Sequence, residues 1–140
     1  MQYKRIMCLD YGDVRIGIAM SDLLQTIASP FETYTRKSLE EDLIYFKTLA
    51  SSQNVEKVVI GLPFNMDGSS GERIEVTKIF GTQLSQTLNI PVEYVDERLS
   101  SVEAEDILAE AGVPAIKRKG LIDKIAASII LESYLNSHKR

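Results

Sequence analysis

The chain has 140 residues, of which 44% are hydrophobic and 26% are charged, and its formal net charge is −4. This length fits one compact domain spanning residues 1–140, and the composition excludes an intrinsically disordered protein. The acidic balance argues against a protein that coats nucleic acid by bulk electrostatics, although it leaves room for a local basic patch.

Three strands are predicted at the start of the chain. Tyr3 to Asp10 is a short apolar strand that ends in an acid, Tyr11-Gly12-Asp13 is a turn, and Val14 to Ser21 resumes the strand pattern. Together these segments predict a β-hairpin. Apolar and polar residues alternate from Ala28 to Thr35, which predicts a further antiparallel strand. Ser29-Pro30 favours an edge position for this strand.

Helices and strands then alternate. Ser38 begins a helix with the capping-box spacing, and this helix runs to about Asn54. The continuous apolar run Val58-Val59-Ile60 predicts a strand that is covered on both faces, at the centre of the sheet. A second helix is predicted from Glu72 to Leu88, with Asn89 as its left-handed stop.

The last part of the chain adds one strand and two helices. Pro91 introduces the strand Val92 to Val95, a helix from Ser100 ends at Gly112, and Leu121 to Asn136 forms the final helix. The predicted order is βββαβαβαα. Since βα units imply parallel strands and hairpins imply antiparallel ones, we expect an α/β fold with a five-stranded mixed sheet flanked by helices.

The chain contains only one cysteine and one histidine as candidate thiolate or imidazole metal ligands or nucleophiles. Cys8 is the single cysteine and lies in an apolar run, which is typical of a buried small hydrophobe, and His138 is the single histidine, near a chain end that we expect to fray. Zinc sites and Ser-His or Cys-His nucleophiles are therefore excluded. No apolar stretch reaches the ~20 residues of a membrane span and no signal peptide opens the chain, so a cytoplasmic protein is expected.

Acidic residues at strand ends are the strongest functional signal. Asp10 ends the first strand, where it either exposes a carboxylate to a ligand or only orders the turn. Asp96 and Glu97 follow the last strand, at the edge where α/β sheets bind ligands, although they would also favour the N-terminus of the next helix. Because neighbouring side chains point to opposite faces, one of the two faces the site, and Glu97 is preferred over Asp96.

The final helix carries a further acid. Asp123 is followed by Ala126 and Ala127 on its own helical face, and these small side chains leave room for the helix to approach the sheet. Asp123 would then reach a metal held by Asp10, unless it simply lies on an exposed face. Carboxylates that converge on Mg²⁺ or Mn²⁺ suit phosphodiester cleavage, because hard cations prefer oxygen ligands.

Two polar segments are weaker candidates for substrate contacts. The loop from Gly61 to Gly68 contains Asn65 and would clamp a substrate, but it lacks the Walker lysine pattern. Lys117, Arg118 and Lys119 form a basic cluster just before the final helix, which suits phosphate binding, although a solvated charge run is the better explanation of the cluster taken alone.

Several short motifs together resemble those of the YqgF (RuvX) family and span nearly the whole chain in that family's order. They are Asp10-Tyr11-Gly12, Arg15-Ile16-Gly17, Ser21-Asp22, Gly61-Leu62-Pro63, Asn65-Met66-Asp67-Gly68, Asp96-Glu97-Arg98-Leu99 and Asp123-Lys124-Ile125-Ala126-Ala127. The resemblance implies a ribonuclease H-like fold related to RuvC-type Holliday junction resolvases, and a Mg²⁺- or Mn²⁺-dependent nuclease that matures the 5′ end of 16S ribosomal RNA precursor.

The resemblance also implies residue roles. Asp10, Asp123 and either Glu97 or Asp96 would be metal ligands, while Arg15 and Arg98 would hold phosphates. The partner would be nucleic acid, either precursor ribosomal RNA or branched DNA, bound by a monomer or homodimer and without a membrane.

Two other functions stay open. A Holliday junction resolvase would cut branched DNA, and a non-catalytic RNA-binding assembly factor would bind without cutting. The second is favoured by the acidic net charge and by the strand ending at Gly61, which carries no acid where many ribonuclease H-like nucleases have one. A phosphotransferase of the actin and sugar-kinase type is disfavoured, because those folds pair two large lobes.

Overall fold

The computed structural model describes residues 3–62, 71–97 and 100–138. Its strands are β1 (Arg5–Tyr11), β2 (Arg15–Ser21), β3 (Ala28–Thr35), β4 (Val55–Leu62) and β5 (Val92–Asp96). Its helices are α1 (Leu39–Ser52), α2 (Glu72–Leu88), α3 (Ser100–Glu110) and α4 (Ala115–Ser137). The predicted order βββαβαβαα is confirmed.

The strands form one mixed sheet in the order β3-β2-β1-β4-β5. β2 is antiparallel to both β1 and β3, whereas β4 is parallel to both β1 and β5. The five-stranded mixed sheet is therefore confirmed, but the placement of Val58 to Ile60 at its centre was wrong, because β1 occupies the centre and β4 lies beside it. Parallel pairing brings the carboxyl ends of β1, β4 and β5 to one edge of the sheet.

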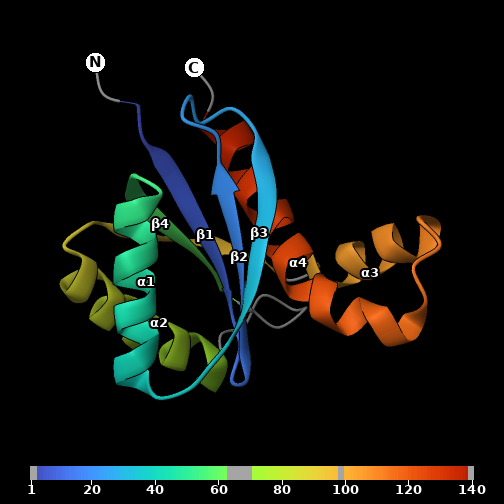
Figure 1. Ribbon diagram of the computed structural model, residues 1–140, viewed down its shortest axis with the longest axis horizontal. Helices are drawn as coiled ribbons and strands as arrows, with labels where there is room; N and C mark the ends of the chain where they lie inside the picture. Colours follow the sequence, from blue (N-terminus) through green and yellow to red (C-terminus); the bar gives the residue numbers. More distant parts are fainter. Residues whose placement is uncertain (1–2, 63–70, 98–99, 139–140) are drawn as a thin grey trace.

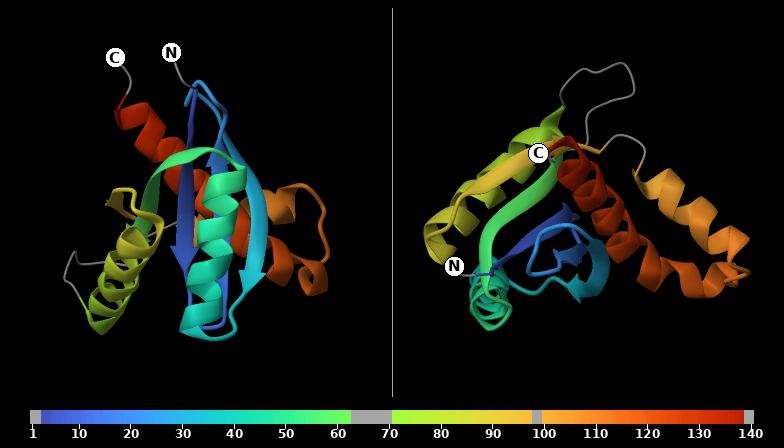
Figure 2. Two further views of the ribbon diagram at one scale, coloured as in Figure 1. Left: turned by 60° about the vertical axis from the view of Figure 1, so that its left-hand side comes forward. Right: turned by 90° about the horizontal axis from the view of Figure 1, so that it is seen from above.

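Helices cover both faces of this sheet (Figure 1). α1 and α2 pack on one face, while α4 crosses the other face over β2 and β3 and carries α3 on its flank (Figure 2). Side chains alternate along β1, so Met7 and Leu9 join the core under α1 and α2, and Cys8 joins Ala127 and Leu131 under α4. Asp10 continues the row of Cys8 and therefore faces α4. Within the described residues, no helix is both long and apolar enough to cross a bilayer.

The ends of α1, α2 and α3 lie within two residues of the predicted ends, whereas the start of α4 lies six residues before the predicted one. The Oγ of Ser38 accepts a hydrogen bond from the backbone N–H of Glu41 at 3.1 Å, and Asn89 ends α2 in the left-handed conformation, as predicted. The final helix was predicted from Leu121 but begins at Ala115, so the basic cluster lies inside it. Lysine and arginine are good helix formers, and one interior glycine, Gly120, costs only ~1 kcal/mol.

Candidate active site

Asp10 and Glu97 meet at the carboxyl edge of the sheet, where their side chains share a hydrogen bond. Asp10 is next to last in β1, and Glu97 follows the last residue of β5, with its backbone N–H donating to the carbonyl of Leu62 at 3.1 Å. This bond continues the β4–β5 ladder, so Glu97 takes the face of Val95 while Asp96 is exposed.

Gly61, at the end of β4, leaves the space that Glu97 occupies. A β-carbon at position 61 would lie 3.0 Å from both Cβ and Cδ of Glu97 and 2.8 Å from Cδ1 of Ile130. Without a side chain there, the Glu97 carboxyl can lie over β4 and reach the side chain of Asp10.

Burial and neighbouring charges strongly perturb the carboxyl group of Asp10. Burial raises the pKa of Asp10 well above its usual range, and the charges of Glu97 and Asp123 raise this pKa further. Arg73 lowers the Asp10 pKa, but its effect is smaller than that of each of these causes. The edge thus concentrates negative charge that either a proton or a cation would relieve.

The third acid, Asp123, is set by a very close approach of α4 to β2. Gly17 pairs with Asp10 in the β1–β2 ladder, and a β-carbon at Gly17 would overlap the carbonyl oxygen of Asp123. Ala126 and Ala127, which were predicted to let this face of the helix approach the sheet, are fully buried. Glycine at position 17 therefore determines how near α4 carries Asp123 to the strand ends.

The carboxylate of Asp123 is bound by an arginine. Nε of Arg15 donates to Oδ2 of Asp123 at 2.7 Å, and the two side chains are 31% and 23% exposed. In the part of the chain that the structure describes, no group of three or more His, Cys, Asp or Glu side chains is close enough together to hold a metal ion. Two of the predicted acids thus meet, while the third is near enough to raise the pKa of Asp10 but is bound by Arg15.

Two arginines that the sequence did not single out hold the turn after Asp10. Arg73, in the first turn of α2, donates to the carbonyl of Tyr11 at 3.0 Å and forms an ion pair with Asp13. Arg36 donates to the hydroxyl of Tyr11 at 2.7 Å and to the carbonyl of Gly12 at 3.3 Å. No local pattern marks either arginine, because both contacts join segments that only the tertiary fold brings together.

The structure describes only some of the predicted substrate-binding residues. The side chains that lie outside its description are those of Asn65, Arg98 and Lys119. Lys117 is exposed at the start of α4. Arg118 donates to the carbonyl of Val113 at 2.8 Å and to Glu105 at 2.9 Å, so its guanidinium ties the start of α4 to α3.

Cys8 lies beneath the acids, on the same face of β1 as Asp10. Burial raises the pKa of the Cys8 thiol, and the charges of Asp10 and Glu97 raise it further. The thiol therefore stays protonated and packs as a small hydrophobe, as the sequence indicates.

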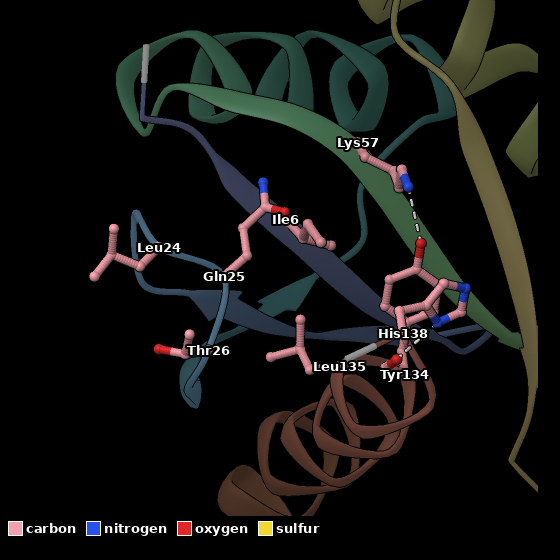
Figure 3. A pocket seen from close by; sticks show the side chains of 8 residues that line it. All are labelled: Ile6, Leu24, Gln25, Thr26, Lys57, Tyr134, Leu135 and His138. Carbon is pink, nitrogen blue, oxygen red and sulfur yellow. Dashed lines mark hydrogen bonds between the residues drawn. The ribbon is translucent and has the colours of Figure 1, made fainter. Parts of the chain in front are cut away.

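A cavity of about 670 Å³ lies at the opposite edge of the sheet, near the starts of β1 and β4 (Figure 3). Beside it, Lys57 donates to the hydroxyl of Tyr134 at 2.9 Å, and this hydroxyl donates to Glu93 at 2.5 Å. His138 was expected to fray, but its ring stacks on Tyr134 with the ring centroids 4.0 Å apart. The cavity is lined by none of the predicted acids and is separate from their site.

Comparison with known proteins points to one family. The family model described as "RuvX: Holliday junction resolvase" matches residues 4–137. A Halothermothrix orenii protein is 54% identical over 132 residues, which cover 94% of each chain. A Caldanaerobacter subterraneus protein is 47% identical over 136 residues, covering 96% of this chain and 98% of the relative. Both carry the name "Putative pre-16S rRNA nuclease".

Solved structures with low sequence identity share the fold. T. thermophilus RuvC in complex with a Holliday junction substrate matches with a TM-score of 0.61 and 12% identity, covering 96% of this chain and 95% of that one. The fowlpox virus resolvase in complex with Holliday junction DNA matches with a TM-score of 0.60 and 15% identity, covering 97% and 99%. The ribonuclease H-like α/β fold expected from the sequence is confirmed.

Proposed function

Because the chain belongs to the RuvX family of Holliday junction resolvases, we propose that it is a divalent-metal-dependent nuclease that hydrolyses phosphodiester bonds. The names of its relatives support precursor 16S ribosomal RNA as the substrate, in processing of its 5′ end. The observation that carries the proposal is the hydrogen-bonded pair of Asp10 and Glu97, with Asp123 close enough to raise the pKa of Asp10.

Carboxylate oxygens fit Mg²⁺ or Mn²⁺, since hard cations prefer oxygen ligands. Asp10, Glu97 and Asp123 would hold the ion, and burial of Asp10 beside two other acids favours its binding, because a cation relieves the repulsion between them. A bound divalent cation supplies positive charge that stabilises the oxygens on which negative charge develops during cleavage. The exposed Asp96 is set aside as a ligand in this proposal.

The protein's own groups orient the acids and bind the substrate backbone. Arg73 and Arg36 fix the turn after Asp10 and so restrict the direction of its carboxyl group. The exposed Lys117 would contact a phosphate as a point charge, and Asn65 and Arg98 remain predicted substrate ligands. Arg118 is less available for this, because Glu105 and a backbone carbonyl already accept its hydrogen bonds.

A four-way DNA junction is the second candidate substrate, favoured by the description of the family model. The two substrates differ in what the protein must do, since resolving a junction takes paired cuts in opposing strands whereas trimming an RNA end does not. A homodimer would supply the paired sites, and a monomer suffices for the RNA.

The test is cleavage of both substrates under controlled metal conditions. Purified protein would be incubated with precursor 16S ribosomal RNA and with a four-way DNA junction, each with Mn²⁺, with Mg²⁺ or with EDTA. We expect metal-dependent shortening of the RNA at its 5′ end. Tight RNA binding with no cleavage in any metal would instead support a non-catalytic assembly factor.

Neighbouring acids at the end of β5 provide a matched pair of variants. Glu97→Gln removes a carboxylate that touches Asp10, so we expect kcat for RNA cleavage to fall at least ~100-fold, which corresponds to about 2.7 kcal/mol of transition-state stabilisation. Asp96→Asn removes an exposed carboxylate next to it and should leave kcat within about threefold, a change of less than ~0.7 kcal/mol. The reverse order of effects would make Asp96 the metal ligand.

A further inference from the structure

The ion pair between Arg15 and Asp123 lies where the metal site needs its third acid. We propose that Arg15 is a latch that competes with the divalent cation for Asp123, and that the cation displaces its guanidinium from the carboxylate. This inference rests on the proposed function, because it assumes that the acids bind a metal. It adds a role for Arg15 that operates before any substrate arrives.

The backbone at Asp123 has little freedom to move. A β-carbon at Gly17 would overlap the carbonyl group of Asp123, so the main chain of α4 already lies against β2 at this point. The helix cannot advance farther to bring Asp123 to the other acids. The carboxylate must therefore change partner by rotating its own side chain between staggered conformations.

Asp10, with which Asp123 would share the cation, lies near the ion pair between Arg15 and Asp123. Gly17 pairs with Asp10 across the β1–β2 ladder, and Arg15 lies two residues before Gly17, on the same face of β2. The charge of Asp123 already raises the pKa of Asp10 from its position on Arg15. Rotation of the Asp123 side chain would then exchange a guanidinium for a cation shared with Asp10.

Exposure makes this exchange feasible. The side chains of Arg15 and Asp123 are 31% and 23% exposed, and ion pairs with this access to solvent contribute little to stability. A hard divalent cation that gains a third oxygen ligand can displace such a partner. The released guanidinium stays beside the acids, where its planar donors suit a phosphate group.

The latch predicts a coupling that calorimetric titration with Mn²⁺ alone can measure. Arg15→Gln should tighten Mn²⁺ binding about threefold to tenfold, since the metal no longer has to break an ion pair. In the Asp123→Asn background, Arg15→Gln should change the affinity by less than about twofold, because the pair that it removes is already absent. Arg73→Gln is the control: it removes a charge near Asp10 that does not contact Asp123, and its effect should be the same in both backgrounds.

Three outcomes overturn the latch. If Arg15→Gln tightens Mn²⁺ binding equally in the wild-type and Asp123→Asn backgrounds, the arginine acts only as a nearby charge. Unchanged affinity in the single variant would show that it does not compete at all. If neither the wild-type protein nor any variant binds Mn²⁺, the metal-dependent function fails together with the latch. If the protein binds metal and cleaves RNA but Arg15→Gln has the same effect in both backgrounds, only the latch is refuted.

Arginine side-chain NMR can follow the Arg15–Asp123 hydrogen bond directly in the wild-type protein, without comparing the metal affinities of variants. The Nε–H signal of Arg15 should shift when Mg²⁺ saturates the wild-type protein, because Asp123 no longer accepts its hydrogen bond. Without metal, the same signal in Asp123→Ala, which has no side-chain acceptor at this position, should lie near the Mg²⁺-bound position. A signal that stays in place at saturating Mg²⁺ would overturn the proposal.

Discussion

Asp10→Asn is expected to abolish metal-dependent cleavage, with a loss of at least ~1,000-fold in kcat/KM, equivalent to about 4 kcal/mol of transition-state stabilisation. The substitution keeps the size of the side chain and its ability to hydrogen bond with Glu97, but it removes the charge that a metal requires. Cleavage of precursor ribosomal RNA in Mn²⁺ measures the loss. Cleavage at the wild-type rate would remove Asp10 from the proposed site.

The same variant should be more stable than the wild type in the absence of metal. The pKa of Asp10 is raised in the folded protein by burial and by Glu97, so the folded state holds its proton to higher pH than the unfolded chain does. The stability that this proton confers is complete below the unfolded pKa of ~3.9 and is lost as the pH rises through the folded value. Asparagine carries no such charge and avoids the loss.

Thermal unfolding in EDTA at a series of pH values from pH 4 upward tests this sign, because the pKa of Asp10 is raised from its usual value of ~3.9. The advantage of Asp10→Asn over the wild type should grow with pH, and about 1 kcal/mol would appear as roughly 4 °C in Tm. Asp96→Asn serves as the control, because it makes the same substitution at an exposed carboxyl group. A lower Tm for Asp10→Asn at neutral pH would contradict the repulsion inferred for the acids.

Local patterns predicted the helices and strands well, because strand alternation, helical spacing and helix caps depend only on residues that are close in sequence. The Ser38 cap and the Asn89 stop are both of this kind. Strand order is different, since the hydrophobic run at Val58 to Ile60 cannot reveal whether β1 or β4 lies at the centre of the sheet. The start of α4 was missed for a related reason: its basic first turns carry no apolar periodicity, whereas the hydrogen bond from Arg118 to Glu105 joins this part of the helix to α3.

The acids of the candidate site could be found from the sequence because strand ends on parallel strands converge. Alternation along β5 indicated that only one of Asp96 and Glu97 faces the site, Glu97 was preferred, and Glu97 is the residue that lies beside Asp10. The arginines could not be placed in the same way. The partners of Arg73 and Arg15 lie 62 and 108 residues away along the chain, so only tertiary packing reveals that they hold the turn and Asp123.

Gly17→Ala should strongly destabilise the protein although it leaves every charge in place. A methyl group at position 17 would overlap the backbone carbonyl of Asp123, and neither β2 nor α4 can yield without moving the helix off the sheet. We expect a loss of about 3 kcal/mol in the free energy of unfolding, at the upper end of typical overpacking costs. Displacing Asp123 by even ~1 Å should also reduce kcat about 100-fold.

Gly120→Ala is the matched control for Gly17→Ala, because it makes the identical substitution three residues before Asp123, inside α4. A β-carbon at Gly120 would meet nothing within 4 Å, so alanine there should raise the free energy of unfolding by roughly 0.5–1 kcal/mol through its better helix propensity. The free energy of unfolding in urea should therefore fall for Gly17→Ala and rise for Gly120→Ala. The rates of Mn²⁺-dependent cleavage by the two variants should differ widely, with Gly17→Ala the slower. A Gly17→Ala protein as stable and as active as Gly120→Ala would mean that contact between α4 and β2 does not position Asp123.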